Sequence, residues 1–296
     1  MRAILFYICL PFLYVFAWLP FPLIYGLSSV FCFLLRDVVG YRKKVVLTNL
    51  RHSFPEKSDQ EIRKIAKEYY VFLCDVFLET FKMLTISKQT MLRRCGVSPA
   101  GYKVFDDLFQ QKANFIVVMG HFGNWEWGSH RYTLLGKNQL YAIYHPLQNP
   151  YFDRLIKKMR SRFGTKLIPM EDTFRQMLSL RNTVSATAFI ADQTPPPDHA
   201  YWTTFLHQET PIFLGTEKIA KKMDLPIVYA SVNRKKRGYY EIDAELLVAH
   251  PAQTSDGEIS ELHTKRLEQD IVRQPETWLW SHRRWKHKKP VQKEGN

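Results

Sequence analysis

The first 36 residues constrain this chain most, because they form one long apolar stretch. No charged residue occurs between Ala3 and Leu35. About 20 consecutive apolar residues are enough to cross the hydrocarbon core of a bilayer, and soluble helices are rarely apolar on every face. A secretory signal peptide fits poorly, since the stretch is too long and no small-x-small cleavage site follows it. We therefore expect residues 1–36 to be a hydrophobic membrane anchor and residues 37–296 to form the globular body.

Prolines and flanking charges bear on how this anchor meets the membrane. Pro11, Pro20 and Pro22 would kink or break a single straight helix. A kinked span, a re-entrant hairpin and a helix lying in the interface therefore all remain open. Because positive charge flanking a span favours the cytoplasmic side, we expect the body there. The basic residues that follow the stretch are Arg36, Arg42, Lys43, Lys44 and Arg51.

The basic excess points to negatively charged partners. The net charge is +14 and the sequence pI is about 9.5, which favours nucleic acid, anionic lipid surfaces or acidic substrates. Zinc-finger spacing is absent from the sequence, and so is the glycine–aromatic signature of an RNA-binding sheet. We therefore expect an anionic membrane surface and no nucleic acid. The four cysteines form no CxxC pair, which indicates free thiols in a reducing compartment.

Hydrophobic periodicity in the body predicts strands alternating with helices. Ser58 to Glu61 reads as a capping box before a long amphipathic helix that ends near Leu84. Phe115–Met119 is a short apolar run of the kind that is buried on both faces of a parallel sheet. The sequence therefore predicts an α/β fold with a mixed, largely parallel sheet flanked by helices. Further strands are expected at 140–144, 166–168, 184–190, 226–232 and 239–246, and further helices at 149–162, 173–180, 215–223 and 262–273.

Polar residues stand at the ends of three predicted strands. They are His121, the pair Tyr144-His145, and the pair Asp192-Gln193. Ligands of open α/β sheets bind beyond the carboxyl ends of the strands. We therefore expect these residues, which are distant in sequence, to share one rim.

The spacing His121-x4-Glu126 suggests acid–base chemistry. A carboxylate beside a histidine can fix its tautomer and support the imidazolium, so that His121 can take a proton from a hydroxyl. Alone, the spacing describes equally well a structural histidine beside a solvated glutamate. Its place after a buried strand, between Gly120 and Gly123, favours the catalytic interpretation. The sequence lacks GxSxG, GxxxxGK[ST], GxGxxG and HExxH motifs, and we expect no metal.

At this point the motifs resemble those of a known family. Gly120–Trp127, GHFGNWEW, resembles the H-x4-D/E signature of the lysophospholipid acyltransferase superfamily, in the form typical of its bacterial lipid A late acyltransferase (lauroyl/myristoyl acyltransferase-like) branch. The similarity covers nearly the whole chain. Its other motifs match Tyr144-His145-Pro146 with Asn149-Pro150, Arg160 with Arg162, Asp192 with Gln193, and Pro275-Glu276 followed by Trp280-Ser281-His282-Arg283-Arg284-Trp285-Lys286.

The resemblance implies a glycerol-phosphate-acyltransferase-like fold for residues 37–296, bound to the inner membrane. It implies transfer of a fatty acyl group from a thioester of acyl carrier protein, or of coenzyme A, to a hydroxyl of a membrane lipid, with no other cofactor. His121 would be the base and Glu126 would orient it, while backbone amides near Gly123 and Asn124 would stabilise the oxyanion. Arg160 and Arg162 would bind an anionic headgroup, and Asp192 would position the acceptor or an arginine, with Gln193 beside it.

Several alternatives stay open from the residues alone. The family has an arginine where this chain has His145, so the acceptor is a lipid A precursor, a lysophospholipid or an aminolipid. Arg283 and Arg284 would touch anionic lipid or the acidic carrier protein, or belong to a plain basic tail. Two rivals come from other functional classes: a hydrolase of the same fold, and a non-catalytic basic protein that binds membranes.

Overall fold

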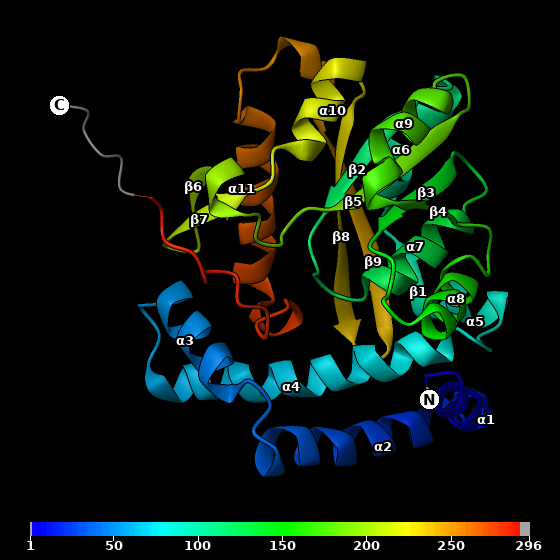
Figure 1. The fold of residues 1–296 in the computed structure, drawn as a ribbon, viewed down its shortest axis with the longest axis vertical. Helices are drawn as coiled ribbons and strands as arrows, with labels where there is room; N and C mark the ends of the chain where they lie inside the picture. Colours follow the sequence, from blue (N-terminus) through cyan, green and yellow to red (C-terminus); the bar gives the residue numbers. More distant parts are fainter. Residues whose placement is uncertain (1, 291–296) are drawn as a thin grey trace.

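A computed structural model describes residues 2–290 of the chain. Its centre is a seven-stranded sheet in the order β1-β9-β8-β2-β5-β3-β4 (Figure 1). All neighbouring strands are parallel except β8 and β9, which form an antiparallel hairpin. The predicted mixed, largely parallel sheet is thereby confirmed. The strands are β1 (Cys95–Val97), β2 (Phe115–Met119), β3 (Gln139–Tyr144), β4 (Lys166–Pro169), β5 (Ser185–Ile190), β8 (Ile227–Lys236) and β9 (Tyr239–Val248).

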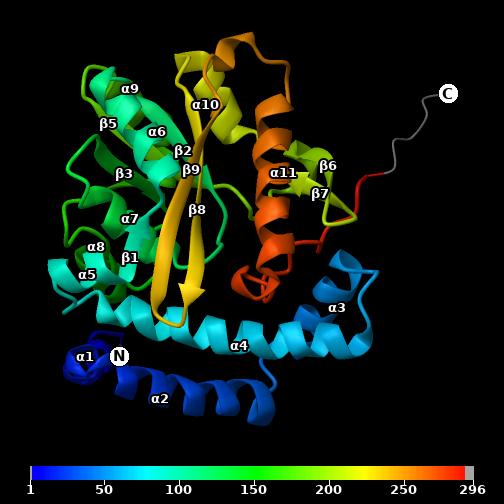
Figure 2. The same ribbon diagram turned by 180° about the vertical axis from the view of Figure 1, so that it is seen from behind.

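Helices cover both faces of this sheet, as the strand sequences require. In β2, Ile116 and Val118 face one apolar cluster while Phe115 and Val117 face another, because successive side chains of a strand point to opposite faces. The long helix α4 contributes to both clusters and lies across the ends of the strands (Figures 1 and 2). The helices of the body are α3 (Lys43–Ser53), α4 (Asp59–Lys82), α5 (Lys88–Arg94), α6 (Pro99–Gln110), α7 (Trp125–Thr133), α8 (Pro150–Arg160), α9 (Thr173–Ser179), α10 (Gly215–Met223) and α11 (Glu258–Arg273).

The structure adds elements that periodicity did not reveal. The helix α6 and the hairpin of β6 (Tyr201–Phe205) and β7 (Gln208–Ile212) were not expected. The expected basic turn at 233–238 is mostly strand, since β8 continues to Lys236. Residues 234–237 are all lysine or arginine, a composition that does not suggest a strand. Pairing with β9 nevertheless holds Arg234 and Lys236 in the sheet.

The apolar N-terminus forms two helices instead of one. Helix α1 (Arg2–Trp18) ends before Pro20, which is the N-cap of α2 (Phe21–Phe33), and α2 continues into a π-helical turn (Leu34–Val38). Pro11 lies inside α1. Phe21–Val38 is the one helix among residues 2–290 that is long and apolar enough to cross a membrane by length and composition.

These two helices bury one apolar face, with Phe6, Phe21 and Ile24, but also expose many large apolar side chains. Helix α2 lies alongside α4 (Figure 1), while α1 contacts α8, where Phe6 packs against Tyr151 and Phe152. An exposed apolar surface of this kind marks contact with a membrane or a partner and is consistent with membrane association. Its members on α1 and α2 include Ile4, Tyr7, Ile8, Phe12, Val15, Trp18, Leu23, Leu27, Val30, Phe31 and Phe33.

Candidate active site

The candidate site lies where β2 and β5 end side by side. These strands pair in parallel with Met119 opposite Ile190, and each is followed within two residues by a polar side chain. His121 and Asp192 therefore leave the same edge of the sheet and meet. Asp192 accepts a hydrogen bond from the backbone N–H of His121 at 2.8 Å, and its Oδ1 lies 2.6 Å from Nδ1 of the imidazole.

The indole of Trp278 holds this carboxylate from a third segment. Trp278 Nε1–H donates to Asp192 Oδ2 at 2.8 Å, and both side chains are buried. The backbone around Trp278 also pairs with the loop after β2, because Phe122 and Trp278 form an isolated antiparallel bridge. The C-terminal motif thus packs directly on the His121 loop.

The electrostatics of the pair follow from this geometry. Burial alone would lower the pKa of His121, but the charge and hydrogen bond of Asp192 outweigh it, so that the pKa is raised above its ordinary value. Burial alone would raise the pKa of Asp192, but His121 and Trp278 instead lower it well below its usual range. Because the ionised carboxylate of Asp192 accepts a hydrogen bond from Nδ1–H, the neutral imidazole carries its proton on Nδ1 and leaves Nε2 as the basic nitrogen.

Glu126 does not hold His121, contrary to the sequence-based expectation. Its carboxylate instead receives a forked pair of bonds from Arg160, with Nε at 3.0 Å from Oε2 and Nη2 at 2.5 Å from Oε1. Glu126 stands in the first turn of α7, whose direction carries its side chain toward α8 and Arg160. It still raises the pKa of His121 through its charge, after the larger effect of Asp192.

The other expected substrate-binding residues occupy varied positions. Arg162 donates to the backbone oxygen of Met83 at 2.9 Å. His145 is exposed after β3, where its Nδ1 lies 3.0 Å from the oxygen of Pro146. Gln193 is exposed after β5. The structure therefore brings His121 and Asp192 into contact, and Glu126 and Arg160 into contact, as two separate pairs.

The Gly123 amide is not free to bind an oxyanion, which corrects the expectation for this residue. Its N–H donates to the backbone oxygen of Thr277 at 2.9 Å. Gly123 has a φ of +63°, and a Cβ built there would lie 1.6 Å from the oxygen of Val232, so that only glycine fits. The N–H groups of Trp125 and Glu126 lie in the first turn of α7, where a helix leaves its amides without backbone partners.

The side chain of Asn124 caps helix α7. It is fully buried, and its Oδ1 accepts from the N–H of Trp127 at 3.0 Å, which caps α7. Its Nδ2 donates to Glu79 Oε2 at 2.7 Å. The cap fixes the direction in which α7 leaves the His121 loop.

Arg284 lies inside the protein, so that it is not part of an exposed basic tail. It is 1% exposed and donates to the backbone oxygen of Pro211 at 2.7 Å. Burial lowers its pKa to about 10. Sequence reasoning missed this position because a run of basic residues near a terminus usually marks a solvated surface.

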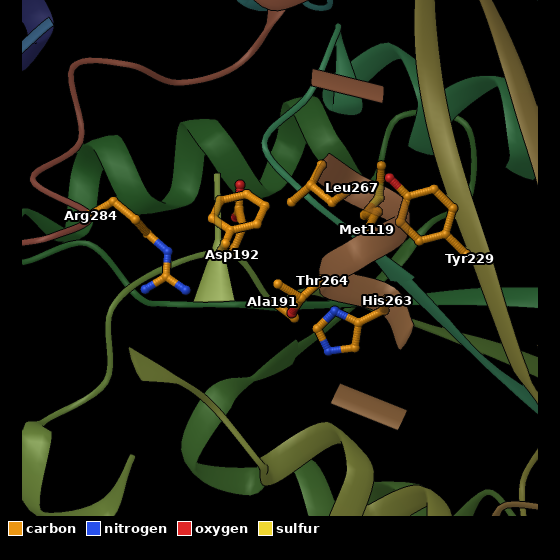
Figure 3. Close-up of a pocket in the computed structure, with 9 residues that line it drawn as sticks. Met119, Ala191, Asp192, Tyr229, His263, Thr264, Leu267 and Arg284 are labelled. Carbon is orange, nitrogen blue, oxygen red and sulfur yellow. The ribbon is translucent and has the colours of Figure 1, made fainter. Parts of the chain in front are cut away.

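A small cavity borders Asp192 and is lined by residues at the ends of β2 and β5 and on α11. Its volume of about 10 Å³ is close to what one water molecule needs. Figure 3 shows Asp192, His263 and Arg284 around it, with Thr264 and Tyr229. Burial lowers the pKa of His263 to about 4, which keeps its imidazole neutral. Nothing in the sequence motifs identified His263, because it lies on α11, outside them.

A protein metal site needs at least three ligand side chains close together. Within residues 2–290, no three His, Cys, Asp or Glu side chains gather in an arrangement that could hold a metal ion. The groups that the structure does bring together at the strand ends are an imidazole and its carboxylate partner, beside the start of a helix.

Comparison with known proteins identifies the family. The family described as bacterial lipid A biosynthesis acyltransferase matches residues 1–287. The lipid A biosynthesis lauroyltransferase of Escherichia coli is 24% identical over 270 residues, covering 90% of this chain and 87% of the relative. The lipid A biosynthesis palmitoleoyltransferase of E. coli and a lipid A biosynthesis acyltransferase of Shigella flexneri are each 23% identical over 272 residues, covering 90% of this chain and 86% of the relative. The chain is thus an acyltransferase that belongs to the bacterial lipid A biosynthesis acyltransferase family.

Proposed function

We propose that this acyltransferase moves a fatty acyl group from an acyl thioester to a hydroxyl of a lipid A precursor, with His121 as the general base and Asp192 as its partner. The observation that carries the proposal is the 2.6 Å contact between Asp192 and Nδ1 of His121, which leaves Nε2 as the site for a proton. The relatives named above, which act in lipid A biosynthesis, support the class of acceptor.

The proposed reaction needs only the groups already described. The acceptor hydroxyl gives its proton to Nε2 of His121, and its oxygen forms a bond with the thioester carbonyl carbon. The carbon–sulfur bond then breaks, and the imidazolium returns the proton to the leaving thiolate. Asp192 stabilises the imidazolium between these two steps, while the amides at the start of α7 face the developing negative charge.

The Glu126–Arg160 pair has a different proposed role. The side chain of Arg160 is 29% exposed while that of Glu126 is 10% exposed. An arginine whose fork is already oriented by a carboxylate can offer its remaining N–H groups to a phosphate. We assign Arg160 to the anionic headgroup of the acceptor, with Arg162 close by, and Glu126 to holding Arg160. Because His145 stands where the family has an arginine, we assign it to acceptor selection.

The donor, the partners and the location complete the proposal. We propose acyl carrier protein as the carrier of the thioester, with coenzyme A as the alternative to be tested. Residues 1–36 would anchor the chain in the inner membrane, and the basic body would face its anionic cytoplasmic surface. No further cofactor enters these steps.

The test is an assay of acyl transfer with the full chain purified in detergent. Acyl carrier protein and coenzyme A thioesters are each supplied with a lipid A precursor, a lysophospholipid or an aminolipid, and products are identified by mass spectrometry. We expect acylated lipid A precursor, and we expect His121→Ala to lose at least about 100-fold in kcat. Free fatty acid without acylated lipid would show a hydrolase. Transfer by His121→Ala at the wild-type rate would show that the base is wrong.

A further inference from the structure

A third carboxylate, Glu79, contacts the segment that carries His121, and the proposed chemistry does not use it. Glu79, on α4, is fully buried. It accepts hydrogen bonds from the hydroxyl of Tyr25 at 2.7 Å, from Asn124 Nδ2 at 2.7 Å and from the hydroxyl of Tyr240 at 2.7 Å. These donors come from α2, from the loop after β2 and from β9. One side chain therefore joins the apolar N-terminal helix, the central sheet and the segment that carries His121.

The hydrogen bond from Asn124 connects Glu79 directly to the loop that carries His121. Asn124 follows His121 by three residues and caps α7 through its other side-chain atom. The backbone oxygen of Glu79 also accepts from Trp127 Nε1 at 3.2 Å. Glu79 thus contacts Asn124, which caps α7, and Trp127 in the first turn of that helix. These contacts bear on the direction in which the backbone N–H groups of that turn point.

The ionised form of Glu79 suits these contacts because each partner, Tyr25, Asn124 and Tyr240, donates a hydrogen bond to it. Oε2 accepts from both Asn124 and Tyr240, while Oε1 accepts from Tyr25. A carboxylate can accept all three bonds, whereas a carboxamide has one accepting oxygen and must turn an NH₂ group toward a donor. An isosteric amide at this position would therefore disturb at least one bond inside the protein.

The surroundings of Glu79 contain charges of both signs. Asp75, one turn away on α4, is paired with Arg234 and Arg237 from the β8–β9 hairpin. Burial raises the pKa of Glu79 to about 7, although the bonds from Tyr25, Tyr240 and Asn124 oppose this rise. Among the described residues Glu79 forms hydrogen bonds and no ion pair, so its position depends on each of its three donors.

The same interface contains a second, independent contact between α2 and α4. Ser28 donates to Asp75 Oδ1 at 2.6 Å, one turn along α2 from Tyr25. This contact fastens the same two helices but does not lead to Asn124. It therefore separates docking of α2 from support of the His121 loop.

We propose that Glu79 is a positioning residue that ties helix α2, through Tyr25, to Asn124 and the His121 loop. Helix α2 is then a structural support of the active site as well as the membrane-facing element of the chain. The inference rests on the proposed function, because the loop it supports is the one that carries the general base.

The experiment compares three variants of the full chain in detergent. Glu79→Gln and Tyr25→Phe break the connection, while Ser28→Ala is the matched control. Acyl transfer is measured with varied donor and acceptor, and amide hydrogen exchange is followed by mass spectrometry over residues 120–127. We expect Glu79→Gln to lower kcat about 10- to 100-fold, as losses of supporting hydrogen bonds do, with both KM values within about 2-fold of wild type. Exchange over residues 120–127 should rise in Glu79→Gln and, to a smaller degree, in Tyr25→Phe.

The outcomes separate this inference from the proposed function. A wild-type kcat in Glu79→Gln, or unchanged exchange over residues 120–127, would overturn the inference. Equal losses in Ser28→Ala would also overturn it, because they would reduce the effect to docking of α2. If the wild-type chain itself formed no acylated lipid, the proposed function would fail, and the exchange measurement would still decide whether Glu79 holds the loop.

Discussion

Asp192 Oδ1 lies 2.6 Å from Nδ1 of His121, although 71 positions separate the two residues in the sequence. The contact exists because β2 and β5 are adjacent parallel strands whose ends are in register. The nearer carboxylate along the chain, Glu126, is paired with Arg160 instead. Two carboxylates thus pair with two basic side chains, Asp192 with His121 and Glu126 with Arg160. The role proposed for each pair can be tested separately.

Asp192→Asn should lower kcat far more than the binding of either substrate. The amide can no longer stabilise the imidazolium, and it permits the tautomer that hides Nε2. We expect a loss of about 100- to 10,000-fold in kcat, measured by steady-state acyl transfer. Glu126→Gln is the matched comparison, since it removes a neighbouring charge but leaves the contact with Nδ1. An equal or larger loss of kcat at constant KM in Glu126→Gln would contradict this assignment.

The pH dependence of kcat/KM should reflect the raised pKa of His121. Only the neutral imidazole can accept a proton, so the rate should rise with pH and level off above this pKa. Burial favours the neutral form, but Asp192 and then Glu126 favour the protonated form, which places the rise above pH 6.5, the ordinary value. In Asp192→Asn the opposing charge is gone, so the midpoint should move to lower pH while the plateau falls. A midpoint that stays in place would show that another group is being titrated.

The Glu126–Arg160 pair should contribute to stability as well as to headgroup binding. Arg160→Met would leave a mostly buried carboxylate without its cation, which costs about 3 kcal/mol for pairs of this kind. We expect a fall of several degrees in Tm, measured by thermal unfolding in detergent. Adding Glu126→Gln to Arg160→Met should recover part of this loss. Arg162→Met, which loses a bond to a backbone oxygen but leaves no carboxylate without its cation, is the control and should change Tm much less.

Gly123→Ala should prevent folding or abolish activity, whereas Gly136→Ala should be tolerated. Both glycines have a left-handed φ, of +63° and +67°, so the backbone strain of an alanine is similar at the two positions. A Cβ at Gly123 would meet the backbone oxygen of Val232, while one at Gly136 would enter open space. Gly136→Ala should therefore cost about 1 kcal/mol, seen as a small shift in Tm. Soluble, fully active Gly123→Ala protein would contradict the close approach described here.

Most strands of the central sheet could be predicted because their signals are local. Phe115–Met119 is an uninterrupted apolar run, and the structure places β2 at these residues. The capping box at Ser58 is present, with Glu61 bonded back to it. The hairpin of β6 and β7 was missed because its strands are short and follow a proline-rich loop, and because contacts with the C-terminal segment stabilise them, such as that between Trp285 and Thr210.

The partner of the histidine was predicted wrongly for a physical reason. Spacing along the chain indicated Glu126, since a residue one turn into the next helix can reach back. The sequence also placed Asp192 at a strand end on the same rim, but it could not choose between the two carboxylates. That choice depends on the register of β2 against β5 and on the direction of α7, which Asn124 caps.

The sequence by itself determined the apolar N-terminus, the alternation of strands and helices, and the residue types at the strand ends, because each depends on neighbours within about ten positions. Only the tertiary structure decided that His121 meets Asp192, that Glu126 meets Arg160, that Arg284 is buried, and that Tyr25 of the apolar helix reaches Glu79. These contacts join segments that are far apart in the chain, and their energies depend on burial and orientation, which are properties of the packed molecule and not of any local pattern.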